Sequence, residues 1–276
     1  MSIKVAIQGE LGSFHHEAAS RLFGADVAVS ACATFREVFA SVEQEVIGLT
    51  AVENSLYGSI NEVYDLLEKH RHQIFAEIEL SIHQNLIGLV DRRPSDDIRE
   101  IYSHHVALAQ CENYLEQHFP KAERIEFEDT AAAVRHIAEL GRPDAVAIAG
   151  RAAAELYPTT KILAAKIEDN PVNFTRFIAI APPSAIKKLP TINQPNSTPK
   201  SSIILTTSHR AGALYQALGV FDRHQINLTK LQSRPIIGQK WRYKFYLDFE
   251  ANAAETAQVI ADLRGLGNEV VLLGNY

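Results

Sequence analysis

The sequence predicts an α/β protein in two parts, and three observations support this prediction. From Lys4 to Ile180, short apolar runs typical of strands alternate with segments whose apolar residues recur at helical spacing. Residues 181–200 contain five prolines among Asn, Ser and Thr, which is a linker composition. From residue 202 the expected order becomes βαββαβ, a ferredoxin-like arrangement. We therefore expect parallel sheets with helices on both faces, followed by a small separate domain.

The composition is that of an ordinary globular protein. The 276 residues are 46% hydrophobic and 22% charged, with a formal net charge of −6. This charge and the absence of a basic cluster argue against a nucleic-acid partner. Cys32 and Cys111 are isolated, as in a reducing compartment, and no apolar run reaches membrane-spanning length. We expect a cytoplasmic protein without a membrane partner and, because the histidines lack ligand spacing, without metal or cofactor.

The first elements surround a possible anion site. A strand is expected at residues 4–8 and a helix at 14–23, with Ser13 as its N-cap and Gly24 at its end. A glycine-containing turn that leads into a helix exposes backbone N–H groups, and these favour an anion. Ser13 is therefore a candidate binding residue.

A second polar group follows the next expected strand. The pattern predicts a helix at 34–46 and a strand at 47–52. Ser59 and Glu62 have the spacing of a capping box for the following helix. Open α/β sheets bind ligands between strand ends and helix starts. Three polar residues occupy that position here: Glu53, Asn54 and Ser55.

The middle of the chain continues the alternation. Strands are expected at 75–82, 86–90, 101–103 and 145–149, and helices at 105–119, 130–140 and 150–156. Asp129 and Thr130 begin the second of these helices. His83 follows the strand at 75–82. Two interpretations remain open for it: a satisfied imidazole at a strand end, or a donor facing a cleft.

The segment NPVNFTRFIAI, at 170–180, contains the most informative pair. Its last four residues predict a buried strand, and Thr175 and Arg176 lie at the start of that strand. A guanidinium matches a carboxylate, and a threonine hydroxyl is a small directional donor, so the pair suits an acidic substrate. The alternative is a turn in which Thr175 caps the backbone and Arg176 meets a surface carboxylate.

After the linker, six elements are expected. Strands are predicted at 202–207, 226–235, 241–250 and 269–273, and helices at 212–224 and 253–266.

Several segments together resemble one enzyme family, prephenate dehydratase. They are GELGSFHHEAA (9–19), VENSLYGSINEVYDLL (52–67), HQNLIG (83–88), SHHVALAQC (103–111), DTAAAV (129–134) and NFTRF (173–177). The tail resembles an ACT regulatory domain through GALYQAL (212–218) and INLTKLQSRP (226–235). The resemblance follows the order of the family's motifs and spans nearly the whole chain.

The resemblance implies a fold and an activity. The fold is a two-lobed catalytic domain like a periplasmic binding protein, with the site between the lobes, joined to an ACT domain. The expected bounds are 1–79 with 167–181 for one lobe, 80–166 for the other, 182–200 for the linker and 201–276 for the ACT domain. The implied reaction is the decarboxylating dehydration of prephenate to phenylpyruvate in L-phenylalanine biosynthesis. The alternatives are an arogenate dehydratase and a non-catalytic solute-binding or sensor protein.

The resemblance also implies roles for individual residues. Thr175 would donate to the leaving hydroxyl, Arg176 would bind a substrate carboxylate, and either Glu53 or His83 would supply the proton. The substrate-binding residues would be Ser13, Asn54, Ser55, Thr130 and Phe177.

The ACT resemblance implies feedback by L-phenylalanine between paired domains, in a homodimer or homotetramer. The implied effector residues are Gly212, Ala213, Leu214, Asn227, Leu228, Gln232, Ser233, Arg234 and Pro235. The chain departs from the family pattern at Gln232, where an acid is usual. It also departs at His15, where a small residue often precedes the second histidine, and at Tyr64, where threonine is common.

Overall fold

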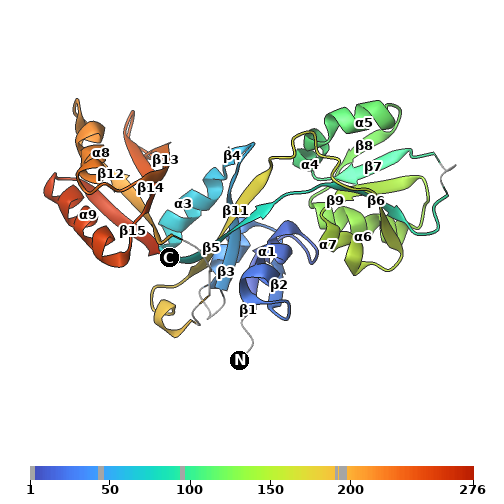
Figure 1. Ribbon diagram of the computed structural model, residues 1–276, viewed down its shortest axis with the longest axis horizontal. Coiled ribbons are helices and arrows are strands. Elements are labelled where there is room, and N and C mark those ends of the chain that lie inside the picture. Colours follow the sequence, from blue (N-terminus) through green and yellow to red (C-terminus); the bar gives the residue numbers. More distant parts are fainter. Residues whose placement is uncertain (1–3, 43–46, 94–96, 190–191, 193–197) are drawn as a thin grey trace. The chain divides into compact units, whose positions relative to one another are not determined.

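The computed structural model describes residues 4–42, 47–93, 97–189, 192 and 198–276 (Figure 1). The chain forms two compact units, one made of residues 1–63 and 78–178 and the other of 64–77 and 179–276. Each unit is described by itself. Among the described residues, no helix is long and apolar enough to cross a membrane.

The first sheet contains the N-terminal strands and the later strand β11. Its strand order is β2-β1-β3-β11-β5, and β4 pairs with β3. The strands are β1 (Lys4–Gln8), β2 (Ala28–Cys32), β3 (Ile47–Asn54), β4 (Gly58–Ser59), β5 (Gln73–Ser81) and β11 (Phe174–Ala181). The helices along this part of the chain are α1 (Phe14–Phe23), α2 (Phe35–Ser41) and α3 (Asn61–His70). Strand β1 runs parallel to both β2 and β3.

The second sheet belongs wholly to the first unit and has the order β10-β6-β9-β7-β8. Its strands are β6 (Asn85–Leu89), β7 (Glu100–Ser103), β8 (Glu123–Glu126), β9 (Ala145–Ala149) and β10 (Thr160–Ala164). The helices in this region are α4 (His105–Gln110), α5 (Glu112–His118), α6 (Thr130–Leu140) and α7 (Arg151–Leu156). Alanine-rich α6 packs closely on the sheet and buries Val134 and Ile137.

The α/β class is confirmed, but the expectation of parallel sheets is wrong for part of the chain. Strand β6 pairs antiparallel with both β9 and β10. The sequence pattern also missed β2, β8 and β10. Each of these is an edge strand with exposed residues, so it lacks the apolar run that marks a buried strand.

One helix expectation needs correction, and two others are only partly covered by the described structure. The helix expected at 105–119 is interrupted at Cys111 and forms α4 and α5 instead. Asp169 forms hydrogen bonds with the backbone on both sides of the break. Its N–H donates to the Gln110 carbonyl at 2.8 Å, and its carboxylate accepts from the N–H of Asn113 at 3.1 Å. The helix expected at 34–46 is α2, and residues 43–46 lie outside the described residues. The Ser59–Glu62 capping box stays a prediction, and α3 itself begins at Asn61.

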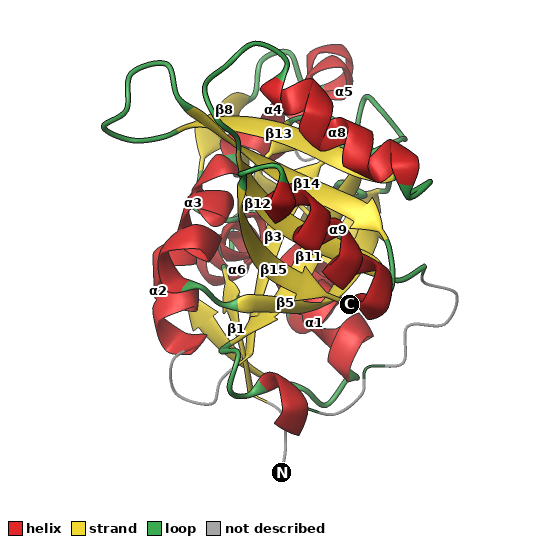
Figure 2. Cartoon of the chain, turned by 90° about the vertical axis from the view of Figure 1, so that its left-hand side faces the viewer, coloured by secondary structure: helices red, strands yellow, loops and turns green. Residues whose placement is uncertain are grey.

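In the second unit, the chain after the linker forms the expected βαββαβ order. The elements are β12 (Lys200–Thr206), α8 (Ala213–Arg223), β13 (Leu228–Pro235), β14 (Tyr243–Glu250), α9 (Ala253–Gly265) and β15 (Glu269–Asn275). A 3-10 turn at Ile186–Lys188 precedes them. The antiparallel sheet has the order β13-β14-β12-β15. Helices α8 and α9 lie side by side against it (Figures 1 and 2).

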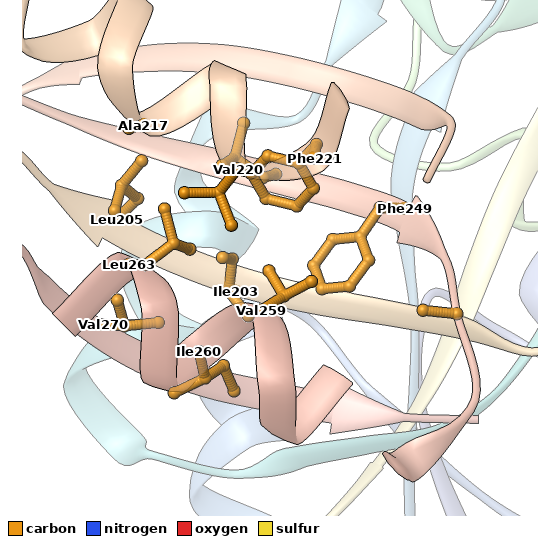
Figure 3. Close-up of a cluster of buried hydrophobic side chains, with 12 residues drawn as sticks. Ile203, Leu205, Ala217, Val220, Phe221, Phe249, Val259, Ile260, Leu263 and Val270 are labelled. Carbon is orange, nitrogen blue, oxygen red and sulfur yellow. The ribbon is translucent and has the colours of Figure 1, made fainter. Parts of the chain in front are cut away.

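The core of this βαββαβ domain explains why its pattern was readable from the sequence. Apolar side chains of α8 and α9 interdigitate with those of β12, β14 and β15 (Figure 3). The rings of Phe221 and Phe249 meet edge to face, with centroids 5.1 Å apart. Burial of side chains of this size contributes about 2 kcal/mol each, so the packed face stabilises the domain.

Candidate active site

A cavity of about 540 Å³ opens in the first unit. Strands β1, β3, β4 and β11 of the first sheet line it, together with the starts of α1, α4 and α6. Five residues expected to bind or transform a substrate line this cavity: Ser13, Asn54, Thr130, Thr175 and Phe177. The structure therefore brings together polar groups from segments separated by more than a hundred residues.

Helix starts supply part of the polar wall. Ser13 is the N-cap of α1, and its hydroxyl accepts from the N–H of His16 at 3.3 Å. Thr130 is the first residue of α6, which Asp129 caps by accepting from the N–H groups of Ala131 and Ala132. Backbone N–H groups at such positions are suited to oxygen anions.

Asn54 fixes the hydroxyl of Thr175. The Asn54 side-chain oxygen accepts from the N–H groups of Leu56 and Tyr57, so its amide nitrogen faces β11. That nitrogen donates to the Thr175 Oγ1 at 2.9 Å and to the Asn173 Oδ1 at 2.8 Å. Because the Thr175 oxygen accepts from Asn54, its own O–H remains available as a donor. Thr175 is 9% exposed and lines the cavity.

Strand alternation puts Thr175 and Phe177 on one face of β11 and Arg176 on the other. In agreement, Thr175 and Phe177 line the cavity, and Arg176 is not among its described lining residues. Thr175 and Arg176 also lie within β11 and not ahead of it, because the strand begins at Phe174. The side-by-side pair expected from the sequence is therefore divided between two faces.

Three other polar residues of the expected set are also not among the described lining residues: Glu53, Ser55 and His83. Glu53 and Asn54 both belong to β3, which extends two residues further than expected, so their side chains alternate. Ser55 connects the end of β3 to β11: its N–H donates to the Phe174 carbonyl, and its hydroxyl accepts from the Phe174 N–H. This is a structural tie between two strands.

His83 belongs to a separate cluster. Its Nδ1 lies 2.7 Å from the Glu168 Oε1, and its Nε2 lies 3.1 Å from the Ser81 hydroxyl. The Glu168 carboxylate is only 2% exposed and also accepts from the N–H of Gln84. Because β5 runs into Ile82 and His83, and Glu168 precedes β11, this cluster joins the two segments that pass between the two sheets.

The described lining of the cavity contains carboxyl groups and no cationic side chain, although an acidic ligand is expected there. Among the described lining residues there is no Lys or Arg, whereas Glu62, Glu128 and Asp129 carry carboxyl groups. Glu62 is paired with Arg36 at 2.9 Å. Burial raises the pKa of Asp129, opposed by the two N–H groups that it caps. Neutral donors therefore have to provide much of the attraction for an anion.

Sequence reasoning missed several lining residues, among them His15, Gln84, His104 and Gln110. His104 is the N-cap of α4, and burial lowers its pKa. Gln84 donates to the side-chain oxygen of Gln110 at 3.1 Å. All four lie in quoted motifs, so the motifs marked the right segments. The direction of each side chain depended on tertiary contacts that the sequence does not display.

The expected effector residues belong to the second unit. Gly212 precedes α8 with a φ of 76°, a left-handed conformation that favours glycine, and Ala213 and Leu214 begin the helix. Asn227 lies before β13 and donates to Glu250. The remaining expected effector residues all belong to β13: Leu228, Gln232, Ser233, Arg234 and Pro235.

Comparison with known proteins identifies the relatives of this chain. The family model described as prephenate dehydratase matches residues 5–185. A bifunctional chorismate mutase/prephenate dehydratase of Aquifex aeolicus (strain VF5) is 36% identical, over 99% of this chain and 73% of that protein. An arogenate dehydratase/prephenate dehydratase 2 of Arabidopsis thaliana, described as chloroplastic, is also 36% identical, over 99% of this chain and 72% of its own length.

Solved structures agree on the fold. A prephenate dehydratase from Arthrobacter aurescens, in complex with L-Phe, superposes with a TM-score of 0.84 at 24% identity. The match covers 99% of this chain and 90% of that one. The family model matches residues 5–185, and relatives match 99% of this chain. The chain therefore belongs to the prephenate dehydratase family.

Proposed function

We propose that the chain converts prephenate to phenylpyruvate, carbon dioxide and water. The observation that carries this proposal is the Thr175 hydroxyl, held by Asn54 in the cavity wall with its proton free to donate. Membership of a family of lyases that eliminate water and carbon dioxide supplies the reaction class. No cofactor is needed, because the product ring is aromatic and the driving force lies in the substrate.

The proposed step needs little more than correct placement of the substrate. The bond from the ring to its carboxylate breaks, and its electrons move through the ring. The bond to the hydroxyl at the opposite ring carbon breaks, and the leaving oxygen takes up a proton. Thr175 stabilises that oxygen as charge develops on it, which is where a fixed donor is most effective. A threonine hydroxyl is a very weak acid, so it passes on or orients a proton that another group supplies.

Neutral donors suit this chemistry. A guanidinium bound tightly to the ring carboxylate would oppose the loss of that group as neutral carbon dioxide. Ser13 and the N–H groups at the start of α1 are our candidates for binding the carboxylate of the side arm, which the reaction retains. The roles expected for Arg176, Glu53 and His83 stay predictions.

Arogenate is the second candidate substrate, and the Arabidopsis relative is named for both activities. Arogenate differs from prephenate by an ammonium in place of the keto oxygen. The test is turnover of each purified substrate by one preparation of the protein, followed by ultraviolet absorbance of the aromatic product. Turnover of prephenate with the higher kcat/KM supports the proposal, and turnover of arogenate alone replaces it.

We also propose inhibition by L-phenylalanine through the βαββαβ domain, acting in a homodimer or homotetramer. The L-Phe complex of the Arthrobacter aurescens protein and the matching order of elements support this part. Adding L-phenylalanine to the turnover assay, and light scattering with and without it, tests regulation and assembly separately. The cytoplasmic location expected from the isolated cysteines belongs to the same proposal.

A further inference from the structure

His15 presents an aromatic ring to the cavity. It is the second residue of α1, only 9% exposed, and it lines the same cavity as Thr175 and Phe177. Its ring meets that of Phe177 edge to face, with centroids 5.0 Å apart, and that of Phe35 at 5.9 Å. These contacts fix the plane of the imidazole, so the direction of its two nitrogens is also fixed.

The hydrogen bonds of His15 determine which nitrogen carries the proton. The N–H of Ala51, in β3, donates to the Nε2 at 3.1 Å, and this contact is buried. A neutral imidazole that accepts through Nε2 must carry its hydrogen on Nδ1. His15 therefore has one N–H donor left for a ligand.

The ring is also uncharged under ordinary conditions. Burial lowers the pKa of His15 from 6.5 to about 3. At neutral pH the side chain is a neutral donor, with no proton to release to a substrate. It can donate a hydrogen bond to a keto or carboxylate oxygen, whereas it has no acceptor for an ammonium.

We propose that His15 determines substrate specificity by donating its Nδ1–H to the keto oxygen of the substrate's side arm, so that the keto acid is preferred over the amino acid. This inference rests on the proposed function and refines it, because it chooses between the two candidate substrates. His15 takes no part in bond breaking.

The spacing along β11 is consistent with this role. Thr175 and Phe177 are two residues apart on one face, which separates them by roughly 6.6 Å. His15 packs on Phe177, and the Thr175 hydroxyl lies toward the other end of this stretch. The leaving hydroxyl and the side arm are attached to opposite carbons of the substrate's six-membered ring. One molecule can therefore reach Thr175 with its hydroxyl and His15 with its side arm.

Two matched variants test the donor. His15→Asn and His15→Leu have similar shapes, and both lose the acceptor for the Ala51 N–H, so they carry the same structural defect. Only asparagine retains a donor near the position of Nδ1. We expect the ratio of kcat/KM for prephenate to that for arogenate to fall about tenfold in His15→Leu and to stay within about threefold of wild type in His15→Asn. His118→Asn, on the exposed surface, is the control.

Three results distinguish the inference from the proposed function. An unchanged ratio in His15→Leu overturns the inference and leaves the proposed function intact. A wild-type protein that turns over neither substrate overturns the proposed function. NMR of protein labelled with ¹⁵N-histidine tests the hydrogen bond of His15 independently of turnover. We expect the Nδ1–H signal of His15, assigned by its loss in His15→Asn, to shift on saturation with phenylpyruvate; no shift overturns the inference.

Discussion

The cavity of the first unit and the βαββαβ sheet of the second use polar residues in different ways. The cavity relies on neutral groups whose directions are fixed by hydrogen bonds, as Asn54 fixes Thr175 and Ala51 fixes His15. In the second unit, the residues of α3 from Tyr64 onward and of β5 up to Glu77 are tied to the sheet by charges. These ion pairs are Arg234–Asp65, Lys244–Glu68 and Lys200–Glu77.

The difference follows from what each group of residues has to do. A donor in a cavity must point in one direction before the ligand arrives, and a buried neutral hydrogen bond maintains that direction at any ordinary pH or salt concentration. Partly exposed ion pairs such as Arg234–Asp65 are weaker and screened by salt. Substitutions in the cavity should therefore affect turnover strongly, whereas substitutions of the ion pairs should affect stability weakly and in a salt-dependent way.

The largest effect is expected from Thr175→Ala. The variant loses the donor at the leaving hydroxyl, so kcat should fall about 100- to 1,000-fold, the usual effect of removing one such donor. Steady-state kinetics with prephenate measure the change, and circular dichroism checks that the fold is retained. Thr175→Ser keeps the hydroxyl and should retain most of the turnover. Equal loss in the serine variant would mean that the methyl group, and not the donor, matters.

The second effect concerns packing in the second unit. A Cβ on Gly274, in β15, would overlap the carbonyl oxygen of Ile74, in β5. Gly274→Ala should lower the free energy of unfolding by about 3 kcal/mol, because a backbone carbonyl cannot move aside as a flexible side chain can. Urea denaturation measures this change. Gly265→Ala, at the end of α9 with open space around it, is the control and should not destabilise.

Gly274 illustrates what the sequence could and could not predict about the fold. The last strand was expected at 269–273, so Gly274 lies one residue beyond the expected end of β15. The same reasoning from sequence patterns found most helices and central strands. Edge strand β8 was missed because its sequence, ERIE, is mostly charged. The approach of β15 to Ile74 is invisible in the sequence, because it depends on how two distant segments meet.

The candidate site shows the same limit. Motifs and caps marked Ser13, Asn54 and Thr175, and all three line the cavity. Arg176 was expected beside Thr175 because the strand was predicted to begin later than it does. Once both residues belong to β11, alternation separates them. From the sequence, His15 was noted only as a departure from the family pattern. The role proposed for it depends on a hydrogen bond with Ala51, 36 residues away, which the sequence does not show.

The third prediction uses pH to test the neutrality of the cavity. The pKa of His15 falls from 6.5 to about 3 on folding. Between these two pH values, His15 is protonated in the unfolded chain and neutral in the folded protein. Its contribution to stability is full above pH 6.5 and is lost as the pH falls toward 3. We expect the free energy of unfolding of wild type, relative to His15→Asn, to drop by about 2 kcal/mol between pH 7.5 and 5.0. A constant difference would mean that His15 has the same pKa in the folded and unfolded states, so that burial does not hold it neutral.

The smallest effect is expected from the ion pair between Arg234 and Asp65. Arg234 donates through Nη2 to the Asp65 Oδ2 at 2.7 Å, but the two side chains are 26% and 42% exposed. A double-mutant cycle with Arg234→Met and Asp65→Asn should give a coupling energy of about 0.5 kcal/mol in 0.1 M salt and less in 1 M salt. The two single variants and the double variant supply their own controls, because effects outside the pair cancel. A coupling above about 2 kcal/mol that salt does not reduce would show that this pair behaves like the fixed contacts of the cavity, and the contrast between the two units would then fail at Arg234.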